Sequence, residues 1–285
     1  MELIRFFFEG VDDVSREQVV KEAMTQDPLF EVKVTKLFRQ YLRVEDPLSL
    51  ERTAYSIVQL LPERKSTSHS SAELATFWDL CVRVAEQIPH DHPFQLKLAR
   101  LLYYLQYSNK TAASTQLGDN EKNNFAIVLH PFRETIRDSL DPAFSPGDRA
   151  ETSNAEHTSR WINVNAFYAN MHAQGWRLSA SCTRAMKYAF ISTPKTDYQA
   201  LECHVVAAAQ WMLYAGQSIF QSSLYPPEET VLGEEAQHWS LDTWTQWKVG
   251  FSNAANETNL MDGTRDIAKR AVTLMDVLES AWQKA

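Results

Sequence analysis

The chain has 285 residues, of which 44% are hydrophobic and 22% charged, and its formal net charge is −8. This composition is typical of a globular protein long enough for one large domain or two small ones. Eight glycines are few for the turns of a β-sandwich or a doubly wound α/β fold. No basic cluster exceeds Arg64-Lys65, which argues against nucleic-acid binding.

Helical spacing of apolar residues recurs along the first half of the chain. Capping boxes begin at Ser15 and Ser70, and Pro28, Pro47 and Pro93 lie at positions that suit the first turn of a helix. Polar loops are expected over 62–71 and 109–122. The helices predicted in this half run over 15–26, 28–43, 47–61, 70–88, 93–108 and 124–140.

The second half begins after a segment that suits a linker or a surface loop. Residues 141–156 contain two prolines, a glycine and many small polar side chains. Strict two-residue alternation is nearly absent from the chain, and no convincing repeat of fixed period is present. The helices predicted after the linker run over 157–174, 177–191, 197–221, 240–256 and 263–284.

These elements predict an all-α fold. We expect one domain over residues 1–285, with 141–156 as the candidate for an internal boundary. Its architecture would be a multi-helix bundle, or an irregular array of antiparallel helix pairs, around a buried central helix.

Cysteine usage and hydropathy give an expected location. Cys81, Cys182 and Cys203 are odd in number, far apart and without CxxC spacing, which indicates free thiols in a reducing compartment. The apolar run within residues 1–9 is short and carries charges, unlike a signal peptide. The longest uncharged stretch, which begins at Cys203, is interrupted by glutamines and serines. We therefore expect a cytoplasmic protein with no membrane span.

The helix predicted over 197–221 is the expected centre of the fold. No Lys, Arg, Asp or Glu occurs from Cys203 to Pro227, whereas a surface helix normally has a charged face. One broad arc of this helix is apolar. A second arc is polar but uncharged, and it is either a hydrogen-bonded layer between helices or the wall of a ligand pocket. The second arc consists of His204, Gln210, Trp211, Tyr214, Gln217 and Ser218.

The helix predicted over 157–174 breaks its own polarity pattern. At 100° per residue, Asn165 and His172 fall in the apolar face, flanked by Trp161 and Tyr168. Such violations are expected at functional or strained sites, although a lone buried Asn or His also serves as a hydrogen-bond partner between helices. The solvent-facing side is expected to hold Arg160, Asn163, Asn170 and Gln174.

Three segments carry a resemblance to a known family. The runs Trp161–Met171, Ala207–Gly216 and Trp244–Lys248 resemble a fungal family of unknown function, domain-of-unknown-function family 3632. The late helix Ala268–Leu278 is similar too, and the resemblance extends over roughly residues 30 to 280. It implies a fungal source, an all-helical intracellular protein and, from the genes near some members, a link to secondary metabolism. It implies no activity and no catalytic residues.

Most familiar catalytic motifs are absent from the sequence. GxxxxGK[ST], GxGxxG, GxSxG and HExxH do not occur, and no Asp-rich helix end supports terpene cyclase chemistry. His90 and His92 could bind a metal, but their position between two prolines favours helix capping. Glu202 and His204 with Tyr214 could act as acid and base. The Glu202 carboxylate could equally just complement a helix dipole.

Two hypotheses from different classes follow. The first is a small-molecule-binding protein or an enzyme without cofactor or metal, whose pocket between 157–174 and 197–221 takes a small apolar or aromatic ligand. The second is a helical interaction or scaffold protein without activity, with an exposed patch around Phe30, Leu37, Phe38 and Tyr41 and the capacity to form a homodimer. In the first hypothesis the catalytic candidates are His172, His204, Glu202 and Tyr214, and the ligand-binding candidates are Trp161, Asn165, Tyr168, Gln210, Trp211 and Gln217.

Overall fold

The structure is a computed structural model that describes residues 28–61, 72–108, 136, 151–176, 178–194, 196–225 and 239–283. The helix predicted over 15–26, the loops over 62–71 and 109–122, and the helix over 124–140 apart from Ile136 lie outside the described residues. Within the described ranges every regular element is helical and none is a strand, so the all-α prediction is confirmed.

The chain divides into two compact units. The first comprises Met1–Ile88 and Lys97–Asp141, and the second comprises Pro89–Leu96 and Pro142–Ala285. This division does not test whether the two units form one domain, so the single-domain organisation expected from the sequence stays a prediction. None of the described helices has the length and apolar character that a membrane span requires.

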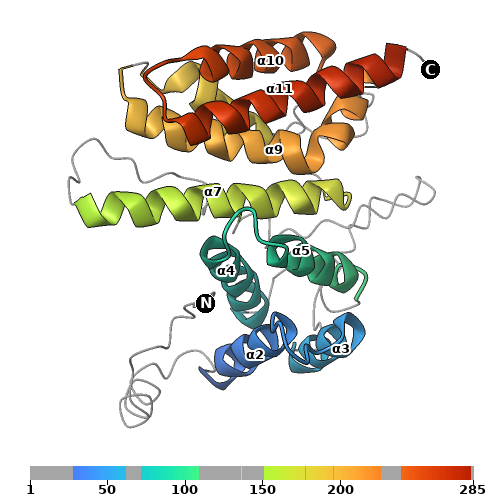
Figure 1. Cartoon of the computed structure of the whole chain (residues 1–285). Helices are drawn as coiled ribbons and strands as arrows, with labels where there is room; N and C mark the ends of the chain where they lie inside the picture. Colours follow the sequence, from blue (N-terminus) through green and yellow to red (C-terminus); the bar gives the residue numbers. More distant parts are fainter. Residues whose placement is uncertain are drawn as a thin grey trace. The chain divides into compact units, whose positions relative to one another are not determined.

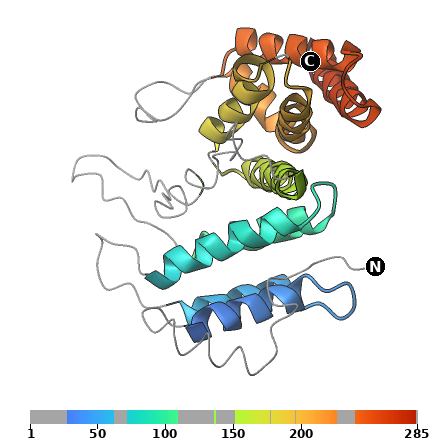
Figure 2. The same ribbon diagram turned by 90° about the vertical axis from the view of Figure 1, so that its left-hand side faces the viewer.

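The first unit contains α2 (Pro28–Tyr41), α3 (Leu50–Leu60), α4 (Ala72–Gln87) and α5 (Phe94–Leu105) from Lys97 onward. Helix α2 packs against both α3 and α4 (Figures 1 and 2). The ring centroids of Phe38 and Phe77 lie 6.1 Å apart at the α2–α4 contact. On the same two helices, Arg83 pairs with Glu31 over 3.0 Å.

The exposed patch expected on α2 is not formed. Phe30, Phe38 and Tyr41 are buried in the first unit, and Leu37 is half-buried. Apolar residues of α2 at these positions are needed for its contacts with α3 and α4, so they are core residues. The exposed apolar side chains of α2 are Leu29 and Val32 instead.

Two helix starts show how the sequence sets the boundaries. Helix α3 begins after Ser49, whose hydroxyl accepts from the Arg52 N–H over 3.2 Å, and not at the predicted Asp46-Pro47. Asp46 has a φ of 46°, a turn conformation outside the helix. Helix α5 follows His92, whose Nδ1 accepts from the Phe94 N–H over 3.2 Å, as the capping interpretation predicted.

The second unit is built around α9 (Figure 1). Helix α9 contacts every other helix of this unit, and its strongest contact is with α7. This long helix begins at Tyr198 because Asp197 caps its start, accepting from the Ala200 N–H over 3.1 Å. The unit contains α7 (Glu151–Ala173), α8 (Ser179–Lys187), the π-helical turn η1 (Tyr188–Ser192), α9 (Tyr198–Leu224), α10 (Leu241–Asn256) and α11 (Asp262–Gln283).

Helices α7 and α9 run parallel. Trp161 contacts His204 near the start of the seam, and His172 contacts Trp211 further along, so residue numbers rise together on both helices. Parallel neighbours need a crossover connection, which α8 and η1 provide. A parallel pair joined through an intervening helix is compatible with the expected succession of antiparallel neighbours.

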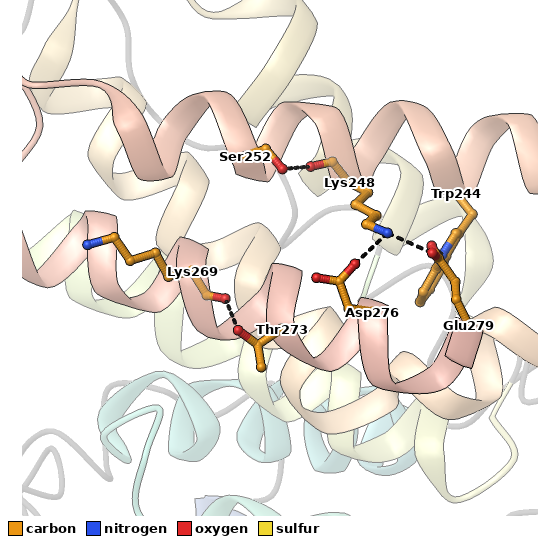
Figure 3. A network of polar contacts seen from close by, with 7 residues as sticks. All are labelled: Trp244, Lys248, Ser252, Lys269, Thr273, Asp276 and Glu279. Carbon is orange, nitrogen blue, oxygen red and sulfur yellow. Dashed lines mark hydrogen bonds and ion pairs between the residues drawn. The ribbon is translucent and has the colours of Figure 1, made fainter. Parts of the chain in front are cut away.

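Helix α10 runs antiparallel to α11 and is tied to it by a polar network (Figure 3). Lys248 Nζ lies 2.5 Å from Asp276 Oδ1 and 2.6 Å from Glu279 Oε2. Trp244 Nε1–H donates to Glu279 Oε1 over 2.8 Å. Trp244 contacts Glu279 and Lys248 contacts Asp276, so residue numbers rise on α10 as they fall on α11 and the two helices run in opposite directions.

The first half of α9 is buried as predicted for a central helix. From Cys203 to Met212 every residue except Val206 is buried. Beyond Met212 the helix is no longer buried on all sides, since Tyr214 is 36% exposed and Gln217 is exposed. The uncharged polar arc is therefore a buried layer at His204 and Trp211 and a solvent-exposed surface towards the C-terminal end of the helix.

The middle of α7 is buried on all sides, which corrects the predicted solvent face. Asn163 and Asn170, expected in solvent, are 7% and 4% exposed. Gln95 Nε2–H donates to the Asn163 carbonyl over 3.2 Å, and the Asn170 amide donates to the Ala166 carbonyl over 2.8 Å. The burial of both asparagines agrees with one feature of the sequence: no Lys, Arg, Asp or Glu occurs from Trp161 to Trp176. As for α9, a helix segment without a charged face is expected to be covered on all sides.

Candidate functional site

The ten predicted site residues lie on two helices that pack against each other in the second unit. Helix α7 carries Trp161, Asn165, Tyr168 and His172, and α9 carries the other six. The packing brings some of these side chains together across the seam and separates others. The six residues on α9 are Glu202, His204, Gln210, Trp211, Tyr214 and Gln217.

A direct hydrogen bond joins the two helices at the centre of the seam. Trp211 Nε1–H donates to Asn165 Oδ1 over 2.9 Å, and Asn165 Nδ2–H donates to the Trp161 carbonyl over 2.8 Å. Both side chains are fully buried. Asn165 therefore acts as a bridge between helices, one of the two roles that its position in the sequence left open.

His172 lies at one end of the seam in an aromatic environment. Its ring centroid is 6.1 Å from that of Trp211 and 5.5 Å from that of Trp239, with both rings tilted by about 60°. The Leu178 N–H approaches His172 Nδ1 to 3.4 Å, and in the tautomer in which this nitrogen accepts, Nε2 carries the proton of the neutral ring. No atom of the described residues accepts from His172 Nε2.

Burial sets the charge of this imidazole. Removal from water lowers the pKa of His172 to about 4, against a smaller opposing effect of a hydrogen bond with the Trp176 backbone. The side chain is therefore neutral near pH 7 and offers a hydrogen-bond donor rather than a positive charge. It is 8% exposed, so this donor is nearly excluded from solvent.

His204 lies in a second aromatic cluster at the other end of the seam. Its ring stacks on Tyr188 at 5.2 Å and 21°, and Trp161 meets it edge-on at 6.1 Å. Burial lowers the pKa of His204 to about 4, although the carboxylate of Asp197 opposes this shift. The two candidate histidines therefore have similar environments but separate partners.

The remaining acid–base candidates lie elsewhere. Glu202 Oε1 accepts from the Met261 N–H over 2.5 Å at the start of α11, where a carboxylate complements the helix dipole. The Tyr214 hydroxyl donates to the His90 carbonyl over 2.9 Å. Burial and the nearby Asp91 raise the pKa of Tyr214. The recorded hydrogen-bond partners of Glu202 and Tyr214 thus lie away from the rings that surround His204.

The other ligand-binding candidates take local or exposed positions. Gln210 Nε2–H donates to the Val206 carbonyl of its own helix over 3.0 Å. Tyr168 is fully buried on α7, and Gln217 is exposed on α9. Gln210 therefore bonds within its own helix, Gln217 lies at the surface, and Tyr168 belongs to the buried core.

Two residues outside the predicted set complete the clusters. Trp239 contacts His172, and its Nε1–H donates to Thr183 Oγ1 over 2.9 Å. Tyr188 contacts His204 and belongs to the π-helical turn. Trp239 lies in an aromatic-rich stretch of the sequence that includes Trp244 and Trp247, a visible signal. Tyr188 had none, because a π turn shifts the helical phase in a way that 3.6-residue periodicity does not reveal.

Metal binding has no support within the described part of the chain, where no three His, Cys, Asp or Glu side chains gather closely enough to hold an ion. Cys81, Cys182 and Cys203 are free and buried. Burial raises the pKa of Cys203 to about 12, so this thiol stays protonated at neutral pH.

Fold and site together define an all-α protein whose second unit buries an aromatic, uncharged seam between two parallel helices. The model of a family described as "Protein of unknown function (DUF3632)" matches residues 78–251, more than half of the chain. The chain therefore belongs to that family. The matched range contains α7 and α9 but ends before α11, where the sequence also suggested a likeness. No curated protein and no solved structure gives a significant match.

Proposed function

We propose that the chain is a small-molecule-binding protein whose ligand accepts a hydrogen bond from His172 Nε2–H. One observation carries this proposal: among the described residues no acceptor meets this buried donor. A buried N–H without a partner costs on the order of 1–3 kcal/mol. Native proteins rarely retain such a group without a reason, and an acceptor supplied by a ligand is one reason.

The surroundings of His172 define the class of ligand. The edges and faces of Trp211 and Trp239 favour an apolar or aromatic body, and the neutral imidazole favours an uncharged oxygen acceptor. A charged ligand would lose its hydration here without gaining a counter-charge from the ring. A neutral ketone, amide or alcohol with a flat apolar body fits this chemistry best.

The proposal is binding rather than acid–base catalysis. A general acid and a general base must both reach the reacting atoms within hydrogen-bond distance. Here Glu202 is engaged at the start of α11 and Tyr214 at the His90 carbonyl, while His172 and His204 lie in separate clusters. The hydrogen bonds recorded for Glu202 and Tyr214 therefore pair neither group with an imidazole.

The setting of this function belongs to the same proposal. The buried free thiols favour a reducing compartment such as the cytoplasm. A fungal source, and a role in secondary metabolism, are supported by the resemblance of the family segments alone. Binding of an uncharged, partly aromatic metabolite is consistent with that setting.

Native mass spectrometry of the full chain, purified from its own source organism, tests the proposal. The wild-type chain should carry an adduct of small mass that is released on denaturation. His172→Leu should lose most of this adduct, because it keeps the apolar contacts and removes the donor. His157→Gln, on an exposed histidine of the same helix, is the matched control and should retain it. An adduct that survives His172→Leu, or a wild-type chain without any adduct, contradicts the proposal.

A scaffold role is the second candidate, and two observations favour it. Asn165 joins α7 to α9 as a purely structural bridge. Tyr104 and Tyr107 on and just after α5 are 49% and 61% exposed, and tyrosine is enriched in protein interfaces. Under this hypothesis Tyr104→Ala with Tyr107→Ala abolishes association with a protein partner, whereas His172→Leu leaves it unchanged. Co-purification of the two variants from the source organism separates the candidates.

A further inference from the structure

A second buried donor lies about three helical turns before His172 on α7. Trp161 is 5% exposed, and nothing in the described ranges accepts a hydrogen bond from its Nε1–H. The indole nitrogen can only donate, so its protonation state is not in question as it is for a histidine. An acceptor must come from outside the described side chains and backbone if this group is to be satisfied.

The rings around Trp161 come from two other elements. Tyr188 of η1 meets the indole edge-on at 6.1 Å, and His204 of α9 meets it at 6.1 Å and 86°. Tyr188 and His204 stack on each other at 5.2 Å. Tyr188 is half-buried, so this wall of the cluster is also the one in contact with solvent.

The π-helical turn is what places Tyr188 there. Helix α8 changes at Tyr188 into the wider turn of η1, and such turns are frequent at functional sites. Helix α10 supports the turn, because Phe190 packs against Phe251 with ring centroids 4.8 Å apart and lies over Gly250. A β-carbon at Gly250 would stand 2.6 Å from the Phe190 ring, so only glycine permits this approach.

This cluster is separate from the one around His172. The hydrogen bond between Asn165 and Trp211 lies between them, and both side chains are completely buried. A ligand at Trp161 therefore reaches a different donor and different rings from a ligand at His172. The inference about Trp161 does not depend on the function proposed above.

We propose that Trp161, Tyr188 and His204 form a second binding site, for a neutral organic molecule that presents a carbonyl oxygen to Trp161 Nε1–H. The carbonyl accepts the hydrogen bond, and the apolar body of the molecule packs on the Tyr188–His204 pair. A charged molecule is disfavoured because the donor is buried among neutral rings.

Proton–nitrogen NMR of the full chain, labelled with ¹⁵N at the tryptophan indoles, tests this site. Trp161→Phe removes one of the eight indole signals and so assigns it. Acetophenone is the probe, and ethylbenzene is the matched molecule without an acceptor. We expect a saturable downfield shift of the Trp161 signal with acetophenone only. The Trp244 signal, already bonded to Glu279, should stay in place.

Two variants keep the test decisive. Trp161→Phe should weaken acetophenone binding about tenfold, read at the ring protons of His204, because one hydrogen bond is lost. If that variant does not fold, Tyr188→Leu retains the donor and removes a wall, and it should weaken the shift at Trp161. Trp282→Phe, at a 47% exposed tryptophan, should have no effect. Equal responses to both probes, no response at Trp161, or a Trp161 N–H that contacts a bound water in the absence of probe would overturn the proposal.

Discussion

Trp211 Nε1–H donates to Asn165 Oδ1 over 2.9 Å, and neither side chain is reached by solvent. This bond is a buried polar connection between the side chains of α9 and α7, and it lies between the two aromatic clusters. Because Asn165 also donates to the Trp161 carbonyl, its amide is held in one orientation. The bond therefore fixes the register in which His172 and His204 meet their aromatic neighbours.

Removing the Asn165 amide should be costly for stability. Asn165→Leu leaves the Trp211 N–H buried without its acceptor, and we expect a loss of about 1–3 kcal/mol in the free energy of unfolding. Urea denaturation followed by circular dichroism measures it. Asn170→Leu is the matched control, since that amide bonds only to the Ala166 carbonyl of its own helix. Equal losses in the two variants contradict the role of the bridge.

A double-mutant cycle isolates the bond itself. Trp211→Phe removes the donor, and in the presence of Asn165→Leu it has no hydrogen bond left to break. The two losses should therefore fall short of additivity by roughly 0.5–3 kcal/mol. Additive losses would show that the bridge contributes nothing beyond the volume of its two side chains.

Stability should fall when the solution is acidified through the range set by the two buried histidines. The pKa of His172 and that of His204 are each lowered from 6.5 to about 4, primarily by burial. Below pH 6.5 these histidines become protonated in the unfolded chain but stay neutral in the folded chain. Acid therefore favours unfolding. At pH 5 the expected cost is roughly 2 kcal/mol per histidine, and below the folded pKa the loss levels off.

The histidine contribution can be separated from that of other groups. Urea midpoints at pH 7.5 and pH 5 should differ less in His172→Gln than in the wild-type chain. The substitution removes one of the two histidines whose pKa is lowered by folding. His157→Gln, at an exposed position, should retain the full difference. A pH dependence that is unchanged in His172→Gln would show that His172 takes up its proton in the folded chain as well.

Gly250 should tolerate no side chain. Gly250→Ala places a β-carbon 2.6 Å from the Phe190 ring, and the expected destabilisation is about 1–3 kcal/mol. Gly216→Ala is the control on α9, where the new carbon would meet Leu274 at an ordinary 3.5 Å. That change should be neutral or stabilise the chain, because alanine favours the helix by up to about 1 kcal/mol. Thermal unfolding compares the two, and Phe190→Leu should recover part of the loss in Gly250→Ala.

The sequence predicted most of the helices and the buried half of α9 because charge and periodicity are local signals. The same signal was present in α7, where the uncharged run from Trp161 to Trp176 indicates cover on all sides, but the helical wheel assigned Asn163 and Asn170 to solvent. A wheel ranks the faces of one helix against each other. It does not show that the least apolar face is itself covered by other parts of the chain.

The candidate site was predictable only as a set of residue types on two helices. His172 and Asn165 stood out because they interrupt an apolar face, and both are buried at the seam. Which side chains meet depends on the parallel packing of α7 and α9 and on the π turn that brings in Tyr188. Neither feature leaves a mark in local periodicity, so the grouping of Glu202, His204 and Tyr214 by sequence proximity did not predict their partners.

The link between α10 and α11 should depend on Lys248 and weaken with salt. Asp276 and Glu279 both contact its ammonium group, and these contacts raise its pKa despite partial burial (Figure 3). Lys248→Met leaves two carboxylates one turn apart without a counter-charge, so we expect a loss of about 1 kcal/mol at low ionic strength. High salt should reduce the difference, because it screens the repulsion between the carboxylates. Lys269→Met, at an exposed pair with Asp266, should change stability very little. Urea denaturation at low and high salt measures both variants, and equal effects would show that the network of α10 and α11 is no stronger than an ordinary surface pair.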